Sequence, residues 1–348
     1  MTDIIPVFDG HNDALLRLHE SGRSDAEQLF LNGAERGHID LPRARKGGLA
    51  GGLFAIFPPP LSNGKENGRR PEDMTFPQLQ QSDALSSTLA MAALLQRLER
   101  MSEGRFAICR NVDAIRHAMA SEALAAVFHI EGTEAVGPDL DLIDVLYAAG
   151  LRSLGPVWSR SNIFGHGVPF RYPASPDIGE GLTEAGKALV RKCNRLRILV
   201  DLSHLNEKGF RDVQAISDAP LVASHSNVHA ICAQSRNLTD WQMSAIRETG
   251  GLAGLNFSVS FLRPDGRTNA DTDFDILMRH LDAMLETLGE DGVALGSDFD
   301  GAMVPRVIGD VAGLPKLIEA MSVHGYGREL IEKIAWRNWL RVLERTIG

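Results

Sequence analysis

A short stretch close to the start of the chain carries metal-capable side chains at intervals of two. Residues 7–13 read VFDGHND, which is typical of a short strand that ends in polar residues. On an extended chain, side chains two residues apart point to the same face. His11 and Asp13 therefore offer an imidazole and a carboxylate on one side, and Asp9 shares their spacing. These two groups are half of a metal site, so the rest of the chain must supply the other half.

Four later segments carry the same chemistry where an apolar, β-rich run ends. They contribute His129, Glu131, Asp201, His204, His225, Asp298 and Asp300. Three histidines, one aspartate and one glutamate are too many for one catalytic zinc ion that keeps an open position, but they suffice for two ions if one carboxylate bridges. Such a pair would acidify a water and give hydroxide near neutral pH. Asp298 is then free to shuttle a proton.

Several of these residues also have a structural interpretation. Asp9 and Asp201 can support the ligands or cap loops, and Asp300 can bond the backbone of its own turn. His129 can be a ligand, a partner of a ligand or packing. The joint pattern, rather than any single residue, favours the metal pair.

The segments that would position these residues are short, apolar and β-rich. They are residues 4–9, 51–57, 124–130, 151–157, 197–202, 220–225, 251–257 and 292–298. Helical patterns lie at residues 76–103, 139–149, 183–196, 206–216, 239–249, 273–288 and 327–346. Several strands are continuous apolar runs, as expected of parallel strands covered on both faces. The alternation predicts an α/β fold, a single (β/α)8 TIM barrel domain over residues 1–348, with its active site at the C-terminal ends of the strands.

An open doubly wound sheet is the alternative fold. No strand followed by GxGxxG and a helix supports a dinucleotide-binding version of it. Two long polar loops, residues 58–74 and 159–181, follow the second and fourth predicted strands and would emerge at the C-terminal face of the barrel. Thr183 and Thr239 are predicted to begin helices as N-caps.

The bulk composition excludes several classes of protein. The chain has 348 residues, of which 44% are hydrophobic and 23% charged, as in globular proteins with a sizeable core. The net charge of -9 argues against a nucleic-acid partner. We expect no membrane association, because we find neither a secretion or anchor signal nor about 20 consecutive apolar residues. The scattered Cys109, Cys193 and Cys232 indicate reduced thiols in a cytoplasm rather than a disulfide framework.

Five motifs, in the order DGHND, HIEG, VDLSH, ASHSN with SRNLTD downstream, and GSDFDG, extend from residue 9 to residue 301. Together they closely resemble the renal (membrane) dipeptidase family of binuclear zinc metallopeptidases. The resemblance implies a (β/α)8 barrel and two divalent metal ions per chain, expected to be zinc. It implies that His11 and Asp13 bind one ion, that His204 and His225 bind the other, and that Glu131 bridges them.

The resemblance also implies roles toward substrate. Asp298 matches the acid/base that passes a proton to the departing amine, and Arg236 matches the arginine that binds the free carboxylate, for which a guanidinium fork is suited. Many members have a histidine after the fourth strand that polarises the scissile carbonyl, and Trp158 stands at that position here. Tryptophan has one N–H donor and no charge. Either Trp158 donates weakly, or His166 or Arg160 substitutes, or the substrate differs.

The predicted function is therefore a cytoplasmic metallo-dipeptidase, in which a metal-bridging hydroxide attacks the peptide bond of a free dipeptide. Some family members accept a D-residue at the second position. The alternatives are the same metal pair acting on another amide or lactam such as an N-acyl amino acid, a mononuclear deaminase-like barrel, and a non-catalytic metal-binding barrel. The mononuclear site would leave Glu131 without a bridging task, and the non-catalytic barrel would not need Asp298. The expected partner is a small-molecule dipeptide, and a homodimer is expected by analogy with the family.

Overall fold

The computed structural model describes residues 4–59 and 76–348, so the predicted loop at residues 58–74 falls almost wholly outside the described residues. In chain order the strands are β1 (Val7–Asn12), β2 (Leu49–Ile56), β3 (Phe106–Ile108), β4 (Leu124–Glu131), β5 (Leu151–Gly155), β6 (Leu199–Val200), β7 (Val222–Ala223), β8 (Leu252–Leu255) and β9 (Val293–Leu295). Every predicted strand has a counterpart, mostly shorter than predicted.

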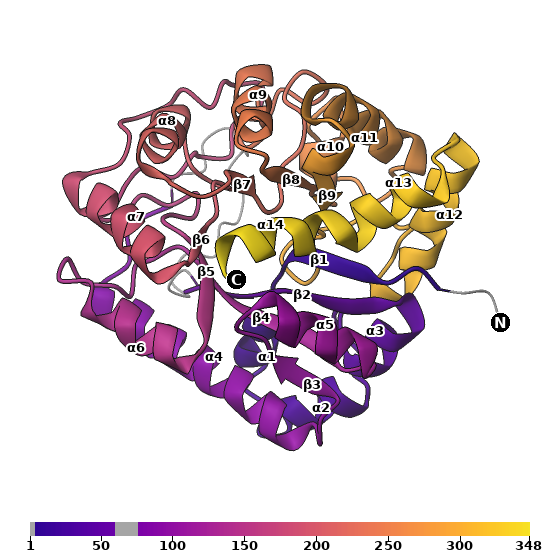
Figure 1. Ribbon diagram of the computed structural model, residues 1–348, viewed down its shortest axis with the longest axis horizontal. Helices are drawn as coiled ribbons and strands as arrows, with labels where there is room; N and C mark the ends of the chain where they lie inside the picture. Colours follow the sequence, from indigo (N-terminus) through magenta and orange to yellow (C-terminus); the bar gives the residue numbers. More distant parts are fainter. Residues whose placement is uncertain (1–3, 60–75) are drawn as a thin grey trace.

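The strands form two parallel sheets, which curl toward each other with helices on their outside (Figure 1). The first sheet has the order β1-β2-β4-β5-β6, and the second has the order β7-β8-β9. Single parallel bridges link the sheets at both edges, between Asp201 and Val222 and between Asn12 and Phe299. At the second seam, Asp13 N also donates to Phe299 O over 2.8 Å. The molecule is therefore an α/β fold built on a curled parallel sheet.

The short strand β3 is the one described strand that the sequence pattern did not predict. It pairs only with the N-terminal part of β4, at residues 124–126, whereas β5 pairs with β4 from Phe128 onward. Its three residues are too few to form a recognisable apolar run. Because β3 lies outside the main strand order, its omission leaves the predicted alternation intact.

Helices follow most strands. They are α1 (Ala14–Glu20), α2 (Ala26–Asn32), α3 (Leu41–Gly47), α4 (Gln81–Met101), α5 (Val112–Ala120), α6 (Asp141–Ala149), α7 (Glu184–Leu196), α8 (Glu207–Ile216), α9 (Asp240–Glu248), α10 (Val259–Leu262), α11 (Phe274–Leu288), α12 (Leu314–His324), α13 (Arg328–Glu332) and α14 (Asn338–Thr346). The helix predicted at residues 327–346 is interrupted by a π-helical turn, Lys333–Arg337, between α13 and α14. Among the described residues, no helix is long and apolar enough to cross a bilayer.

The predicted helix N-termini at Thr183 and Thr239 are confirmed. Thr183 Oγ1 accepts a hydrogen bond from Gly186 N over 3.1 Å at the start of α7. Before α9, Gln242 Oε1 accepts from Thr239 N over 2.9 Å. Side chains thus satisfy backbone N–H groups that a helix start or its cap residue would otherwise leave free.

Side chains along the strands alternate between two buried apolar clusters. The inner cluster, which includes Phe8, Leu53, Val127 and Leu252, packs against α5 and α14. The side chains on the other face of the strands belong to the larger cluster, which lies beneath the remaining helices. Trp339 of α14, a helix that crosses the strands in Figure 1, is fully buried in the inner cluster. Both strand faces are therefore covered, which explains why the strands read as continuous apolar runs.

Glycines let the strands approach closely inside the curl. A Cβ added at Gly254 or at Gly296 would lie 2.0 Å from Ser224 O, and one at Gly10 would lie 2.3 Å from it. Real Cβ atoms do not come this near to a carbonyl oxygen. Strand β1, β8 and the end of β9 thus converge on the carboxyl end of β7, which positions the residues that follow each strand.

This convergence predicts that Gly254→Ala destabilises the fold. The new methyl group would collide with Ser224 O, a backbone atom that cannot move aside cheaply, so we expect a loss of about 1–3 kcal/mol in the free energy of unfolding. Urea unfolding followed by circular dichroism measures the loss. Gly327→Ala is the matched control, because a Cβ there has no neighbour within 4 Å. Equal stability of the two variants would show that the interior is not tightly packed at Gly254.

Candidate metal centre and active site

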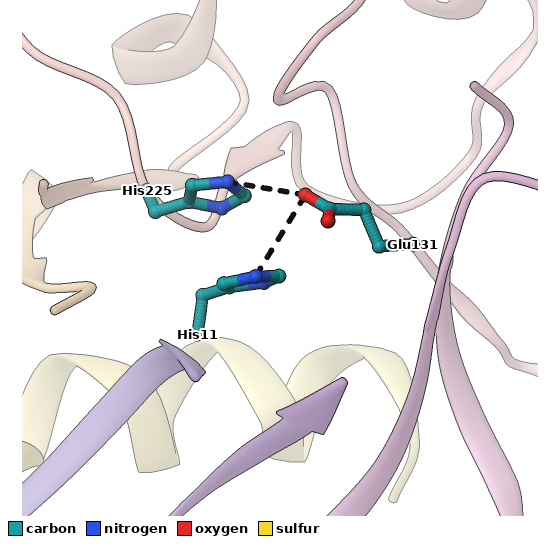
Figure 2. A group of neighbouring side chains, drawn as sticks. All are labelled: His11, Glu131 and His225. Carbon is teal, nitrogen blue, oxygen red and sulfur yellow. Dashed lines mark ion pairs between the residues drawn. The ribbon is translucent and has the colours of Figure 1, made fainter. Parts of the chain in front are cut away.

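The five residues predicted as metal ligands come together at the carboxyl ends of β1, β4, β6 and β7. They are His11, Asp13, Glu131, His204 and His225, all buried. Glu131 Oε1 lies 2.9 Å from His204 Nε2, 3.3 Å from His225 Nε2 and 3.7 Å from His11 Nε2. Figure 2 shows the rings of His11 and His225 directed at this oxygen. Glu131 is therefore the centre of the cluster.

Two groups of close ligand atoms meet at His11, and His204 lies outside both. The ligand atoms of His11, Glu131 and His225 lie within 4.8 Å of one another, and so do those of His11, Asp13 and Asp298. Within the second group, His11 Nε2 is 3.3 Å from Asp13 Oδ2. Each group combines imidazole with carboxylate, the donor types that zinc and similar divalent ions take. The geometry can therefore accommodate metal on either side of His11.

Unpartnered buried atoms indicate that these residues fit a cation. Within the described part of the chain, Asp13 Oδ1, Glu131 Oε1 and His11 Nδ1 are buried without a hydrogen-bond partner. A buried polar atom left unpaired costs about 1–3 kcal/mol. The Nε2 atoms of His204 and His225 also approach each other to 3.1 Å. A divalent cation would satisfy oxygen and nitrogen lone pairs that face one another in this way.

The pKa values of the cluster follow from burial and from its excess of carboxylates. Burial, aided by the charges of Arg236 and His11, lowers the pKa values of His204 and His225 well below the usual range, so both rings stay neutral. Neutral imidazole is the metal-binding form. Burial also raises the pKa of Glu131 to about 8, although His11 opposes the shift.

His11 behaves in the opposite way. Burial disfavours its charged form, but the carboxylates of Glu131 and Asp13 outweigh burial and raise the pKa of His11 to about 10. Without metal, the cluster therefore takes up protons to offset its negative charge. A divalent ion meets the same demand for positive charge.

Residues behind the predicted ligands set the tautomer of one imidazole and contact a second. Ser224 Oγ donates to Asp201 Oδ2 over 2.5 Å and lies 2.6 Å from His225 Nδ1. Because the single hydroxyl proton of Ser224 is directed at Asp201, His225 Nδ1 must be the donor, which leaves His225 Nε2 free to bind metal. His204 Nδ1 also lies against a serine hydroxyl, Ser159 Oγ, at 2.7 Å. Asp201 therefore lies behind His225, a predicted ligand, and contacts it through Ser224.

Asp9, which also has a structural interpretation, joins two strand ends. Its Oδ1 accepts from Ser297 N over 2.6 Å, and its Oδ2 accepts from Ser297 Oγ over 2.8 Å. This pair of hydrogen bonds ties β1 to the segment that follows β9, 288 residues away in the chain.

His129 lies behind His11, with ring centroids 5.7 Å apart, and its Nδ1 is 2.8 Å from Ser153 Oγ. His129 and Asp9 thus lie beside the predicted ligands, outside the two groups of ligand atoms.

Asp298 is positioned by backbone and side chain together. Its φ of 60° lies in the left-handed region, and its N–H donates to His11 O over 3.0 Å. Asn256 Nδ2 donates to Asp298 Oδ2 over 2.9 Å, and the carboxyl faces the cavity described below. Burial raises the pKa of Asp298, although His11 opposes the shift.

Gly301 packs against two of these carboxylates. A Cβ at this position would lie 2.0 Å from Asp13 Oδ2 and 2.6 Å from Asp298 Oδ1, so only glycine fits against both.

Asp300 and His38 form a contact that the sequence analysis missed. His38 N donates to Asp300 Oδ1 over 2.5 Å, and Asp300 N donates to His38 Nδ1 over 2.9 Å. Arg17 of α1 adds an ion pair to Asp300 Oδ2 at 3.0 Å. These contacts fix the turn that carries Asp298 to the segment before α3. No sequence signal could link residues 262 positions apart.

A cavity of about 790 Å³ opens over the cluster. Asp13, Glu131, His204 and Asp298 line its inner part, and Trp158 lines its wall. The Trp158 ring centroid lies 5.7 Å from that of His204. Trp158 therefore lies on the cavity wall, beside His204.

Arg160 and His166 are the two residues that could substitute for a histidine at the Trp158 position. Neither is among the described residues that line this cavity. Arg160 is buried, donating from Nε to Glu134 Oε1 over 2.8 Å and from Nη2 to Pro58 O over 3.0 Å. His166 Nδ1 is 3.4 Å from Ser161 Oγ in the loop at residues 159–181. Neither side chain is presented to the cavity.

Arg236 lies directly behind His225. Its Nη1 donates to Ser226 Oγ over 2.6 Å, and its Nη2 donates to His225 O over 2.9 Å. Its Nε is buried and has no hydrogen-bond partner among the described residues, and Arg236 is not among the described residues that line the cavity. Burial lowers the pKa of Arg236 to about 10, so the side chain remains a cation at neutral pH. One donor of its guanidinium is thus still available.

Comparison with known proteins identifies close relatives. The model of the membrane dipeptidase family, peptidase family M19, matches residues 1–347. A metallo peptidase from Rhodobacter sphaeroides, solved with a phosphinate mimic of the dipeptide L-Ala-D-Ala, superposes with a TM-score of 0.96 and 52% identity over 99% of this chain and 100% of its own. The structure of a dipeptidase AC, a metallo peptidase of family M19, has a TM-score of 0.94 and 51% identity over 99% and 100% of the two chains. An uncharacterized Klebsiella pneumoniae protein in the pqqA 5′ region is 47% identical over 254 residues, 73% of this chain and 94% of its own.

The support of His225 by Ser224 generates a prediction about metal affinity. Ser224→Ala removes the partner of His225 Nδ1 and leaves Asp201 Oδ2 without its hydroxyl donor. Loss of such a supporting contact typically weakens metal binding about 10- to 100-fold. Competition with a chromogenic zinc chelator measures the affinity.

Ser102→Ala is the matched control for this experiment. Ser102 is also fully buried, but its hydroxyl bonds only to backbone, at Glu99 and Phe106. This control should lose stability and keep its zinc affinity. An equal loss of affinity in both variants would mean that Ser224 acts only through general packing.

Proposed function

Because the chain belongs to the membrane dipeptidase family, peptidase family M19, and is a metal-dependent hydrolase that acts on the peptide bond of dipeptides, we propose how its residues divide that task. The observation that carries the proposal is the convergence of three imidazoles on Glu131 Oε1 within 3.7 Å. We assign His11 and Asp13 to one zinc ion and His204 and His225 to a second. Glu131 would be a ligand to both.

When bound, such a metal pair acidifies water and polarises a carbonyl group. The unpartnered Asp13 Oδ1 and Glu131 Oε1 support two ions rather than one, because Asp13 and Glu131 belong to different groups of ligand atoms, which share only His11. Zinc is favoured by the mixture of imidazole and carboxylate ligands.

Asp298 is the proposed acid/base. It shares a group of ligand atoms with His11 and Asp13, so it lies beside the site where a peptide bond would be cleaved. Asn256 holds Oδ2, which leaves Oδ1 to receive a proton and to pass it to the departing amine nitrogen. The left-handed backbone at Asp298 sets the direction of the side chain.

Arg236 is the proposed partner of the substrate's free carboxylate. Its buried cationic side chain lies beside His225, and its Nε has no partner among the described residues. A charge-assisted hydrogen bond from a buried guanidinium would distinguish a free dipeptide from a longer or amidated peptide.

A D-residue at the second position is part of the proposal. The Rhodobacter sphaeroides relative was solved with a mimic of L-Ala-D-Ala, and its 52% identity over 99% of this chain supports a similar substrate here. Trp158, on the cavity wall, is proposed to contact the substrate.

We also infer that the two sheets form one closed (β/α)8 barrel in a single domain. The bridges Asp201–Val222 and Asn12–Phe299 support a ring of eight strands in the order β1-β2-β4-β5-β6-β7-β8-β9. The three cysteines are all free and buried, which supports a reducing compartment such as the cytoplasm. The homodimer stays a prediction.

The experiment that tests this function measures amino-acid release from a panel of dipeptides by zinc-loaded protein, together with zinc content per chain. The panel pairs L and D second residues and includes C-terminally amidated controls. We expect about two zinc ions per chain and release from free dipeptides only. Arg236→Lys, which keeps the charge but loses the planar fork, should reduce the discrimination between free and amidated substrates. If the variant slows both substrate classes by the same factor, Arg236 supports His225 instead of binding substrate.

Asp298→Asn should keep both metal ions and lose most turnover. The amide has nearly the shape of the carboxylate but cannot accept a proton, and general acid/base catalysis contributes roughly 100- to 10,000-fold. Turnover numbers with saturating dipeptide, measured beside zinc content, test this. Near-normal turnover at full zinc content would rule out Asp298 as the acid/base, whereas a loss of zinc would identify it as a ligand.

A further inference from the structure

One side of the cavity is a continuous wall of aromatic rings, which we call the aromatic wall. It consists of Phe57, Phe76, Trp158, Phe170 and Phe261. Successive ring centroids are 5.0 Å apart for Phe57 and Trp158, 5.4 Å for Trp158 and Phe170, and 5.3 Å for Phe170 and Phe261. Phe76 packs on Trp158 at 4.4 Å. Trp158 and Phe170 line the cavity and remain partly exposed.

Trp158 of the aromatic wall and Asp298 adjoin different members of the ligand cluster. From the wall, the ring centroid of Trp158 is 5.7 Å from that of His204, which in turn is 5.1 Å from that of His225. His225 stacks on His11 at 3.9 Å. His11 then shares a group of ligand atoms with Asp13 and Asp298. A substrate that spans the cluster therefore has one end near Trp158 and the other near Asp298.

This order decides which half of a dipeptide meets the aromatic wall. In the proposed function, Asp298 gives its proton to the departing amine nitrogen, so the second residue occupies the Asp298 end. The two Cα atoms flanking a trans peptide bond are about 3.8 Å apart on opposite sides of the bond. With the scissile carbonyl over the cluster, the first residue must extend toward His204 and Trp158.

The chemistry of the wall is apolar. Arg160 and Glu134, a charged pair beside the wall, are buried and joined by a 2.8 Å ion pair, and neither is among the described residues that line the cavity. Beyond the ligand cluster, the charged residues among those described as lining the cavity are Asp265, Arg267 and Asp298. Asp265 is paired with Arg263 at 2.7 Å. A polar side chain placed against the wall would lose water without gaining a partner, whereas an apolar one would be favoured.

We propose that the aromatic wall selects dipeptides whose first residue carries a bulky apolar side chain, aliphatic or aromatic. The selection rests on the proposed function, because the roles of Asp298 and the cluster orient the substrate. Trp158 is the central specificity residue, since it contacts Phe57, Phe76 and Phe170 and adjoins His204.

The test is a series of dipeptides with one fixed second residue and Gly, Ala, Leu, Phe, Asp or Lys in the first position. Values of kcat/KM for the zinc-loaded parent enzyme should favour Leu and Phe over Gly by at least roughly 10-fold, the usual worth of added methylene groups in a hydrophobic pocket. Trp158→Ala should bring the ratio of Leu to Gly close to one, and Trp158→Phe should retain most of it.

Two controls separate selectivity from general damage. Trp241→Ala removes a tryptophan of α9 that packs on Phe210 and Arg211, outside the described cavity lining, and should leave the ratio of Leu to Gly unchanged. A second series with a fixed first residue should show the same ranking of second residues in the parent and in Trp158→Ala.

Each outcome bears on one proposal. Equal cleavage of Gly-first and Leu-first dipeptides by the parent overturns the selection, and so does a Trp158→Ala variant that slows all first residues by one common factor. A changed ranking of second residues in that variant would show that the wall contacts the second residue of the dipeptide, which contradicts the proposal. No cleavage of any dipeptide at full zinc content would instead overturn the proposed function, and the selection with it.

Discussion

Burial of one carboxylate oxygen among three imidazoles is the constraint on which the rest of the site depends. Glu131 Oε1 lies within 3.7 Å of the Nε2 atoms of His11, His204 and His225. The rings of His204 and His225 already turn Nδ1 toward serine hydroxyls, and a neutral imidazole carries a single N–H. Hydrogen bonds among these groups therefore cannot satisfy them all. A cation can, because it accepts lone pairs from every atom that faces it.

The surrounding fold holds this arrangement together. His204, Asp298 and Asp300 adopt left-handed backbone conformations, with φ values of 69°, 60° and 69°. Such conformations are uncommon outside glycine and persist only where neighbouring structure imposes them. Here hydrogen bonds hold each of these segments: Val168 N donates to His204 O, Ser297 N donates to Asp9, and His38 N donates to Asp300. The chemistry thus depends on contacts between strands that are distant in sequence.

The cavity above the cluster is asymmetric, and its two ends suit different tasks. Asp13 and Asp298 make one end acidic, where a proton can be held and moved. Trp158 and Phe170 make the other end aromatic, where water is displaced by apolar groups. Imidazoles occupy the space between. In the proposed function, proton transfer and recognition therefore fall to different side chains, so recognition could change without altering the groups that handle protons.

The sequence by itself determined the donor types, their place at strand ends and the alternation of strands and helices, because these follow from local patterns of period two and from apolar runs. It left open the roles of Asp201, His129 and Asp300, since one spacing serves a ligand and its support equally well. Only the tertiary structure placed Asp201 behind Ser224 and Asp300 against His38. It alone assembled the aromatic wall, whose rings come from residues 57 to 261. Contacts between such distant residues depend on the packing of the whole fold, which no local pattern encodes.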